Sequence, residues 1–403
     1  MEKALGSLPV VRDFCRRLDV AGVIDRLCPV REVAYASHGQ VIEALIANRL
    51  TSPTPLVHVE RWAAEWAVPE ALGLAAASLN DDRVGRALDA IAPQLDAIVG
   101  SVGASAIAGF GIEVSRLHWD MTSISLFGDY DEPDQAFPKP KYGKPKDRRP
   151  DLKQIQTGLA VTGDGGIPVF HRAYDGGAGE VAQVIGAMEE LSKLVGERRF
   201  LVVGDSKLVS YNNLRAMIDA GVSFVAPASK SFVPVEILAG CDINTATPVD
   251  YIAQRDAAKP DGERGAYRVI DHTMTIAAKR KADPELVVRR VFVFSSARAK
   301  AAVHSRDKKL IRAAGDLERL SRGLGGRHYP DTDAVAARCA QIARDRRVGD
   351  YLRTEIGTDE RGRPTLTWRF DQAAIDAEAA TDGWYALLTN LDPAEADGGE
   401  VLR

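Results

Sequence analysis

Two aspartates occupy positions from which a carboxylate could do chemistry. Asp120 lies within a strand-forming run, and Asp205 ends the apolar run Leu201-Val202-Val203-Gly204. A carboxylate is costly to bury without a counter-charge or a metal ion, and α/β proteins place ligand groups at the carboxyl ends of central strands. If the two strands are neighbours, the carboxylates converge, and oxygen ligands of this kind favour Mg²⁺ or Mn²⁺ over zinc. Two such ions could activate a water molecule and stabilise the leaving oxygen of a phosphodiester.

Each aspartate also has a purely structural interpretation. Asp205 could cap the helix that follows it, and Asp120 could form an internal ion pair. His118 lies two residues before Asp120 on the same strand face, where it would neighbour a metal site or, as we favour, pack as a supporting side chain. The residue types alone leave these alternatives open.

A basic segment lies between the first predicted strand and the next. Residues 139–153 hold seven lysines and arginines against two aspartates, a local charge of +5. The segment should lie near Asp120 and would suit the phosphates of DNA, which set affinity without reading sequence. Tyr142 could stack on a base, and a solvated loop is the alternative. The candidate DNA-binding residues are Lys141, Lys144, Lys146, Arg148 and Arg149.

A second basic stretch spans residues 298–327, with nine lysines and arginines against three acidic residues. Its cations do not all share one helix face, so a solvated helix is favoured over DNA contact. The glycines of DGGAG (175–179) precede a predicted helix but lack the lysine of a P-loop and the spacing of a dinucleotide fingerprint. We therefore predict no nucleotide cofactor. Ser123 and Ser206 lack the motifs of a serine hydrolase.

The elements that would position these residues follow from hydrophobic periodicity. Residues 1 to about 110 read as helical, with apolar residues at helical spacing over 38–50 and 83–103. Asn80, Asp81 and Asp82 would cap the second of these helices. Trp62 and Trp66 are four apart and are predicted to share one helix face as core packing.

A mixed α/β layer is predicted from residue 115 onward. The pattern indicates strands at 115–128, 152–163, 167–174, 199–205 and 223–228, with helices at 180–196 and 210–221. Asp164-Gly165-Gly166 is a strong hairpin signal, and this order is not doubly wound. Further strands are predicted at 266–278, 287–296, 363–370 and 383–390, with helices at 297–325 and around 331–349.

Composition narrows the class of protein. The chain has 403 residues, 45% hydrophobic and 27% charged, with a net charge of −4, which excludes disordered and collagen-like classes. No apolar run approaches the roughly 20 residues of a bilayer span, and the start lacks a secretory h-region, so no membrane partner is expected. Four scattered cysteines suggest neither a disulfide framework nor a zinc ribbon, and a cytoplasmic location is predicted.

Three stretches follow one another along the chain: LHWDMTSISLFGDY, YGKPKDRRPDLKQIQTGLAVTGDGGIPVFHRAYDGG and RFLVVGDSKLVSYNNLRAMIDAGVSFVAPAS. Together they resemble the catalytic core of bacterial insertion-sequence transposases. These transposases are DDE enzymes with an RNase H-like fold, in the branch that carries a large insertion before the final catalytic helix. The stretches SLPVVRDFCRRLDVAGVIDRLCP, HGQVIEALIANRL and DDRVGRALDAI are similar to the leading domain of the same family.

The resemblance implies a fold and an activity. It implies an RNase H-like mixed sheet with flanking helices, an α-helical N-terminal domain and an α+β insertion. Asp120 would be the first catalytic, metal-binding aspartate and Asp205 the second, with Mg²⁺ or Mn²⁺ as cofactor. The partners would be double-stranded DNA, both at the transposon ends and at the target, and a second copy of the chain in a synaptic complex. The protein would lie in the bacterial cytoplasm, associated with the nucleoid. The predicted domains are residues 1–112 (end-binding), 113–229 (first part of the core), 230–382 (insertion) and 383–403 (return strand).

The family pattern also requires a third carboxylate, a Glu in a helix after the return strand. Glu355 precedes that strand, and Glu395 and Glu400 lie in an acidic tail without the basic residue that should follow. We therefore expect a transposase truncated before its catalytic Glu, with little or no strand transfer by this chain alone. Two alternatives stay open: an RNase H-like metal-dependent nuclease without transposition, and a catalytically inactive DNA-binding relative.

Overall fold

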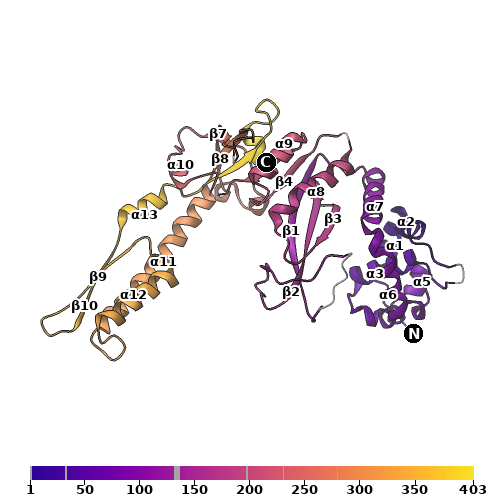
Figure 1. The fold of residues 1–403 in the computed structure, drawn as a ribbon, viewed down its shortest axis with the longest axis horizontal. Coiled ribbons are helices and arrows are strands. Elements are labelled where there is room, and N and C mark those ends of the chain that lie inside the picture. The colour runs from indigo at the N-terminus through magenta and orange to yellow at the C-terminus, as the bar shows by residue number, and fades with distance from the viewer. Residues whose placement is uncertain (1, 32–33, 131–136, 197, 230, 279) are drawn as a thin grey trace. The chain divides into compact units, whose positions relative to one another are not determined.

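The chain divides into two compact units, Met1–Ser223 and Phe224–Arg403, which we describe separately. The structure, a computed structural model, describes residues 2–31, 34–130, 137–196, 198–229, 231–278 and 280–403. Figure 1 shows the helices and strands of both units with their labels.

The first unit begins with a helical region. Its α-helices are α1 (Leu8–Arg17), α2 (Val20–Leu27), α3 (His38–Thr51), α4 (Val59–Glu65), α5 (Val68–Leu72), α6 (Asp81–Ile91) and α7 (Leu95–Phe110). Ser37 and Gln40 form a reciprocal capping box at the start of α3, and the Asn80 side chain accepts the Arg83 N–H at the start of α6. The predicted helix at 38–50 and the predicted cap before residue 83 are both confirmed.

The predicted single helix over 83–103 is wrong in one respect. Helix α6 ends at Ile91, a 3₁₀ turn covers Ala92–Gln94, and α7 starts at Leu95. Pro93 lies in that turn, and a proline removes the backbone donor and clashes with the preceding helical turn. The hydrophobic spacing continues across the break, and for this reason periodicity alone did not reveal it.

Packing around Trp62 holds the helical region together. Trp62 is 2% exposed within a cluster that includes Leu8, Val41 and Ile98. Trp66 is partly buried against the same cluster, with its ring centroid 6.4 Å from that of Trp62. The prediction of core packing is confirmed, but the predicted shared helix face is wrong, because α4 ends at Glu65 and Trp66 follows it with an extended backbone.

One stretch of this region meets the length and composition of a membrane span. The helical stretch Asp81–Phe110 is apolar enough to cross a bilayer, and only 6% of its most apolar window is buried. Helix α7 contacts α2 and β3 of the same unit. A single helix of this kind is weak evidence for a membrane span, because core helices of soluble proteins have the same length and composition. The expected absence of a membrane partner stays a prediction.

A mixed sheet follows the helical region. Its strands lie in the order β3-β2-β1-β4, with β1 (Arg116–Leu126) antiparallel to β2 (Lys153–Thr162) and parallel to β4 (Leu201–Gly204). β3 (Pro168–Tyr174) pairs with β2 through a hairpin whose Gly165 and Gly166 have positive φ angles. Helices α8 (Glu180–Val195) and α9 (Tyr211–Asp219) flank this sheet (Figure 1). The predicted mixed α/β fold is confirmed.

The second unit contains an antiparallel sheet in the order β5-β11-β8-β7-β6. The strands are β5 (Ser223–Pro227), β6 (Thr247–Val249), β7 (Tyr267–Ile276), β8 (Leu286–Ser295) and β11 (Trp384–Thr389). β11 lies between β5 and β8, so the last predicted strand of the chain is a central strand of this sheet. The short helices α10 (Val235–Ala239) and α14 (Gly398–Leu402) belong to the same unit, and α14 contacts β7, β8 and β11.

Two long antiparallel helices form the rest of the second unit. Helix α11 (Ser296–Arg322) packs against α12 (Thr332–Arg346), and both contact a hairpin of β9 (Leu352–Thr358) and β10 (Pro364–Phe370). Leu317, Leu320 and Val335 are among the buried residues between them. Helix α13 (Gln372–Ala379) leads into β11. Both predicted helices are confirmed, whereas β9 was not predicted.

Candidate functional site

The two candidate catalytic aspartates belong to neighbouring strands: Asp120 lies within β1, and Asp205 directly follows β4. β1 and β4 are parallel, and the last pair in their register is Trp119 with Gly204, immediately before Asp120 and Asp205. Hydrogen-bonded strands lie roughly 4.8 Å apart, so the two Cα atoms are brought to the same edge of the sheet. The condition set from the sequence, that the two strands be neighbours, is met.

Both carboxylates are open to solvent. The Asp120 side chain is 66% exposed, because β1 alternates exposed and buried residues and places Trp119 and Met121 on the inner face. Asp205 is also exposed. The cost of burying a carboxylate, considered from the sequence, therefore does not arise at Asp120. A site of this kind is accessible to a substrate as large as DNA.

The inner face of β1 anchors the site. The Trp119 ring lies 5.9 Å from the Phe170 ring of β3, and it occupies the space above Gly158 of β2. A Cβ atom on Gly158 would lie 2.1 Å from the Trp119 side chain, so only glycine fits there. The rigid packing of Trp119 fixes the backbone of the residue that follows it, Asp120.

Asp205 does not cap the following helix. Its Oδ1 accepts the Lys207 N–H at 2.9 Å, in a turn after β4, while Ser210 provides the cap of α9. The capping interpretation of Asp205 is wrong. The ammonium of Lys207 forms an ion pair with Glu180, the first residue of α8, whose side chain is 17% exposed.

The basic segment contacts β1 beside Asp120. The Lys146 Nζ lies 3.4 Å from both carboxylate oxygens of Asp120 and also donates to the Met121 carbonyl. The predicted proximity of this segment to Asp120 is confirmed. The internal ion pair considered for Asp120 is observed with Lys146, but it is exposed and not buried.

The other cations of the basic segment differ in their partners. Lys141 pairs with Asp175 at 2.7 Å and Arg149 with Asp151 at 2.7 Å, which lowers the pKa of both carboxyls through these hydrogen bonds. Within the described residues, the exposed Lys144 and Arg148 side chains make no hydrogen bond or ion pair. Three of the five candidate DNA-binding residues therefore have acidic partners in the protein.

His118 lies two residues before Asp120 on the exposed side of β1. Partial desolvation of its ring by neighbouring side chains, together with the positive charge of Arg116, lowers the pKa of His118. The ring is therefore neutral at physiological pH and does not add positive charge beside the two aspartates.

The donor set fits a divalent cation with oxygen ligands. Mg²⁺ typically keeps several waters and binds through one or two carboxylates plus substrate phosphates. Asp120 and Asp205 supply two such carboxylates at an open edge. Across the described part of the chain, no three His, Cys, Asp or Glu side chains gather into a group that could hold an ion. Protein ligands alone would thus leave coordination positions for water and phosphate.

The third carboxylate is not assigned. Glu355 lies on β9, and the Glu400 Oε2 accepts the Asp397 N–H at 3.0 Å in a capping box at the start of α14. Glu395, the remaining candidate from the sequence, lies in the segment before α14.

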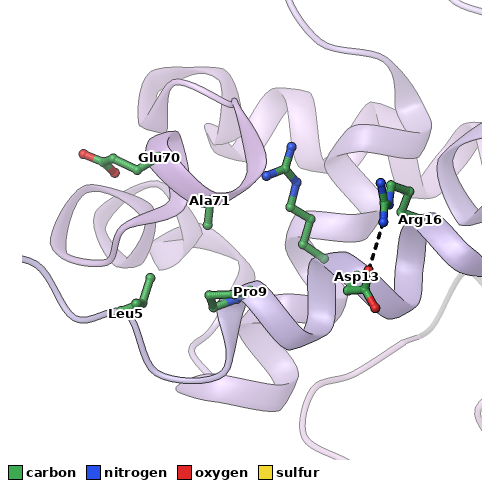
Figure 2. Close-up of a pocket in the computed structure, with 7 residues that line it drawn as sticks. Leu5, Pro9, Asp13, Arg16, Glu70 and Ala71 are labelled. Carbon is green, nitrogen blue, oxygen red and sulfur yellow. Dashed lines mark hydrogen bonds and ion pairs between the residues drawn. The ribbon is translucent and has the colours of Figure 1, made fainter.

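A hollow in the helical region holds none of the predicted site residues. It lies between α1 and α5, and its lining includes Leu5, Pro9 and Glu70 (Figure 2). Figure 2 also shows the ion pair of Asp13 with Arg16, 3.1 Å long, on its rim. Its mixed charges give no indication of a ligand.

The second basic stretch lies in α11 as far as Arg322, and its last residues follow the helix. Lys308, Arg312 and Arg322 are exposed on it, as the solvated-helix interpretation requires. Arg306 differs, because it is 5% exposed and its guanidinium donates to both carboxylate oxygens of Asp382, one at 3.0 Å. Sequence reasoning grouped Arg306 with the solvated cations; its partner lies 76 residues later and could not be identified from spacing.

Comparison with known proteins gives one family match and several structural likenesses. Residues 1–96 match a family described as a domain of unknown function, DUF4277. No curated protein matches the sequence. A piggyBac transposase synaptic complex with hairpin DNA is similar over 73% of this chain and 51% of its own, with 13% identity and a TM-score of 0.28. A Mos1 transposase paired-end complex with the left transposon end is similar over 51% of this chain and 62% of its own, with 10% identity and a TM-score of 0.20.

These structural likenesses are limited in extent. The chain spans about half to three fifths of the two transposases, at 51% and 62% of their lengths. Both TM-scores lie below 0.5, so we argue function from this chain's own residues.

Proposed function

We propose that this chain is a DNA transposase of the DDE class, from a bacterial insertion sequence, that acts on phosphodiester bonds of double-stranded DNA with Mg²⁺ or Mn²⁺. One observation carries the proposal. Asp120 and Asp205, the residues that match the first two family carboxylates, come directly after the last paired residues of the adjacent parallel strands β1 and β4, and both are exposed. The family resemblance of the surrounding sequence supports the same assignment.

The side chains beside the end of the β1–β4 pairing would have separate roles in the reaction. Asp120 and Asp205 would hold the divalent cation, which supplies charge stabilisation at the phosphate and an activated water. In the proposed reaction, water hydrolyses a phosphodiester at the element end, and the freed 3′-hydroxyl then attacks target DNA. Each step forms one P–O bond and breaks one, so no covalent protein intermediate is needed.

The basic segment would hold the DNA backbone beside these carboxylates. Lys144 and Arg148 are exposed with no acidic partner within the described residues, and Lys146 contacts Asp120 itself. Phosphate contacts of this kind fix the position of the duplex without reading its sequence. We further propose that recognition of the element ends belongs to the helical region and that two copies act together in a synaptic complex.

Mn²⁺ binding by the purified chain is the first test, because it requires only the two aspartates and not the unassigned third carboxylate. Electron paramagnetic resonance titration should show a site that is weakened at least about tenfold by Asp120→Asn or Asp205→Asn, since each removes one charged oxygen ligand. Asp164→Asn, on the hairpin between β2 and β3, is the matched control and should bind as the wild type does. Equal Mn²⁺ binding by all four proteins would contradict the assignment.

A second test locates the DNA contact. Footprinting on a plasmid that carries this coding sequence with its native flanking DNA should show protection at inverted ends outside the gene. Any nicking in Mn²⁺ should occur at those ends and disappear in Asp120→Asn. Nicking at random positions would instead support a nuclease without transposition. End binding by a chain that neither binds Mn²⁺ nor nicks would support an inactive relative.

A further inference from the structure

We propose that Lys146 is a resident cation of the metal site: its ammonium neutralises Asp120 in the absence of a divalent ion, and binding of the ion releases it toward DNA phosphate. This inference rests on the proposed function, since it assigns a specific role to one residue of the same site. It makes Lys146 a positioning residue that couples metal binding to DNA binding.

The contacts of the basic segment with β1 carry the first step. Besides the two 3.4 Å contacts of its ammonium with Asp120, the Lys146 backbone N–H donates to the Ser123 Oγ at 3.0 Å. The next residue, Asp147, accepts the Ser125 hydroxyl at 2.6 Å, and this bond lowers the pKa of Asp147. The backbone of this segment is therefore held along β1, and the Lys146 ammonium contacts both the Asp120 carboxylate and the Met121 carbonyl, to which it donates.

The unequal lengths of the two strands provide the room for this arrangement. Pairing between β1 and β4 ends at Trp119, whereas β1 continues to Leu126. The segment contacts β1 beyond the end of β4, so Lys146 lies beside Asp120 at the edge where Asp205 also emerges.

The two aspartates differ in their charge environment. Asp120 has a lysine ammonium against its carboxylate. Within the described residues, Asp205 accepts the backbone N–H of Lys207, whose own ammonium pairs with Glu180, and no cationic side chain contacts it. Asp120 is thus the candidate ligand with a resident cation.

The Lys146 pair has the properties of an exchangeable contact. Its ammonium lies equally far from both oxygens at 3.4 Å, longer than the 2.7–2.9 Å typical of a strong charge-assisted hydrogen bond. The Lys146 and Asp120 side chains are 46% and 66% exposed, and pairs in such surroundings are weak. A divalent ion carries twice the charge and is attracted by Asp205 as well, so it displaces the ammonium.

Displacement has a consequence for DNA binding. The released ammonium adds one positive charge to the surface formed by Lys144 and Arg148 and can reach a phosphate. Metal binding then raises the affinity for DNA, and by thermodynamic linkage DNA raises the affinity for the metal by the same factor.

Mn²⁺ titration of the full chain, the Lys146→Met variant and the Lys144→Met variant tests this inference. Lys146→Met keeps the length of the side chain and removes its charge, so Mn²⁺ should bind about threefold to fivefold more tightly, the range expected for losing an exposed competing pair. Lys144→Met, a matched change in the same segment, should leave Mn²⁺ binding unchanged.

A DNA-binding measurement gives a second readout. The salt dependence of binding to the end-containing plasmid should steepen by about one phosphate contact when Mn²⁺ is added to the wild type, and should not steepen in Lys146→Met.

The outcomes separate this inference from the proposed function. If Mn²⁺ binds the wild type in a manner that depends on Asp120, but Lys146→Met binds it equally or more weakly, the resident-cation role is overturned and the metal site stands. If Mn²⁺ binding is absent or independent of Asp120, the proposed function itself fails.

Discussion

Arg306 joins helix α11 to the entrance of strand β11, and its removal gives a quantitative test of how the second unit is held together. We predict that Arg306→Met destabilises this part of the unit, whereas Lys308→Met, two residues further along the same helix and exposed, changes little. Methionine retains the apolar stem of the arginine, so the comparison isolates the guanidinium.

The magnitude follows from the partners of the guanidinium. Arg306 makes two charged hydrogen bonds to Asp382, whose side chain is 13% exposed, and hydrogen bonds to charged groups contribute about 1.5–3 kcal/mol each. The 3.7 Å contact with Glu378 adds little, because Glu378 is 45% exposed and also receives the Tyr351 hydroxyl. Leaving Asp382 buried without its partner should cost about 3 kcal/mol.

Amide hydrogen exchange is the suitable assay, because a chain of two units need not unfold in one transition. Peptides from α11 and β11 should lose protection equivalent to about 3 kcal/mol in Arg306→Met and less than about 0.5 kcal/mol in Lys308→Met. The double variant Arg306→Met/Asp382→Asn should recover about 2 kcal/mol of the loss, since it no longer buries an unpaired charge.

Two results would refute this reasoning. Equal loss of protection in Arg306→Met and Lys308→Met would show that the guanidinium contributes no more than an exposed cation. Additive losses in the double variant would show that Arg306 and Asp382 are not coupled.

Two further predictions concern stability. Asp316, 8% exposed, accepts the Arg346 Nε at 2.6 Å, and this bond and the nearby Arg319 hold its pKa below its ordinary value of 3.8. The Asp316 carboxylate therefore contributes its full share to the unfolding free energy above about pH 3.8, and this share is lost as the pH falls through the lower pKa of the folded state. Amide hydrogen exchange of α12 peptides, followed as the pH is lowered, should show this loss of protection, and the Asp316→Asn variant should not show it. Gly158→Ala should lower the unfolding free energy by about 1–3 kcal/mol, because the added methyl group overlaps the Trp119 ring. Gly186→Ala, in the middle of α8 with open space around it, should raise the unfolding free energy by about 0.5–1 kcal/mol. Thermal denaturation that ranks the two variants in the opposite order would contradict both expectations.

Hydrophobic periodicity predicted the elements of the candidate site closely. The strand predicted at 115–128 is observed as Arg116–Leu126, and the helix at 180–196 as Glu180–Val195. Asp205 could be placed from the sequence because it directly follows the short, apolar strand β4, and Asp120 because the alternating pattern of β1 around it is typical of a strand. The parallel pairing that brings them together was expected only as a condition, since strand order depends on contacts far apart in sequence.

Strand β9 shows why other elements could not be predicted. Its apolar residues Leu352 and Ile356 are four apart, a spacing that fits a helix as well as one face of a strand. Its partner β10 and the apolar surface of α11 and α12 decide the outcome, and those contacts are tertiary.

The side-chain environment of the site was the least predictable part. The face of β1 on which Asp120 lies was not predicted: the alternation of the strand places Asp120 on the exposed side, whereas Trp119 and Met121 take the buried positions. The contact of Lys146 with Asp120 depends on where β4 stops relative to β1, and no local pattern encodes that difference in length.

The internal pairing of the basic segment bears on how such a protein would search a genome. Lys141, Lys146 and Arg149 each have an acidic partner, so each must exchange one contact before it can bind a phosphate. Under the proposed function, this lowers affinity for the roughly 10⁶–10⁹ competing sites of bulk chromosomal DNA more than for a site that also engages the metal and the helical region. The free protein would therefore dissociate readily from unrelated DNA. Lys141, Lys146 and Arg149 would exchange their acidic partners for phosphates only at a site where the metal and the helical region also contact the DNA.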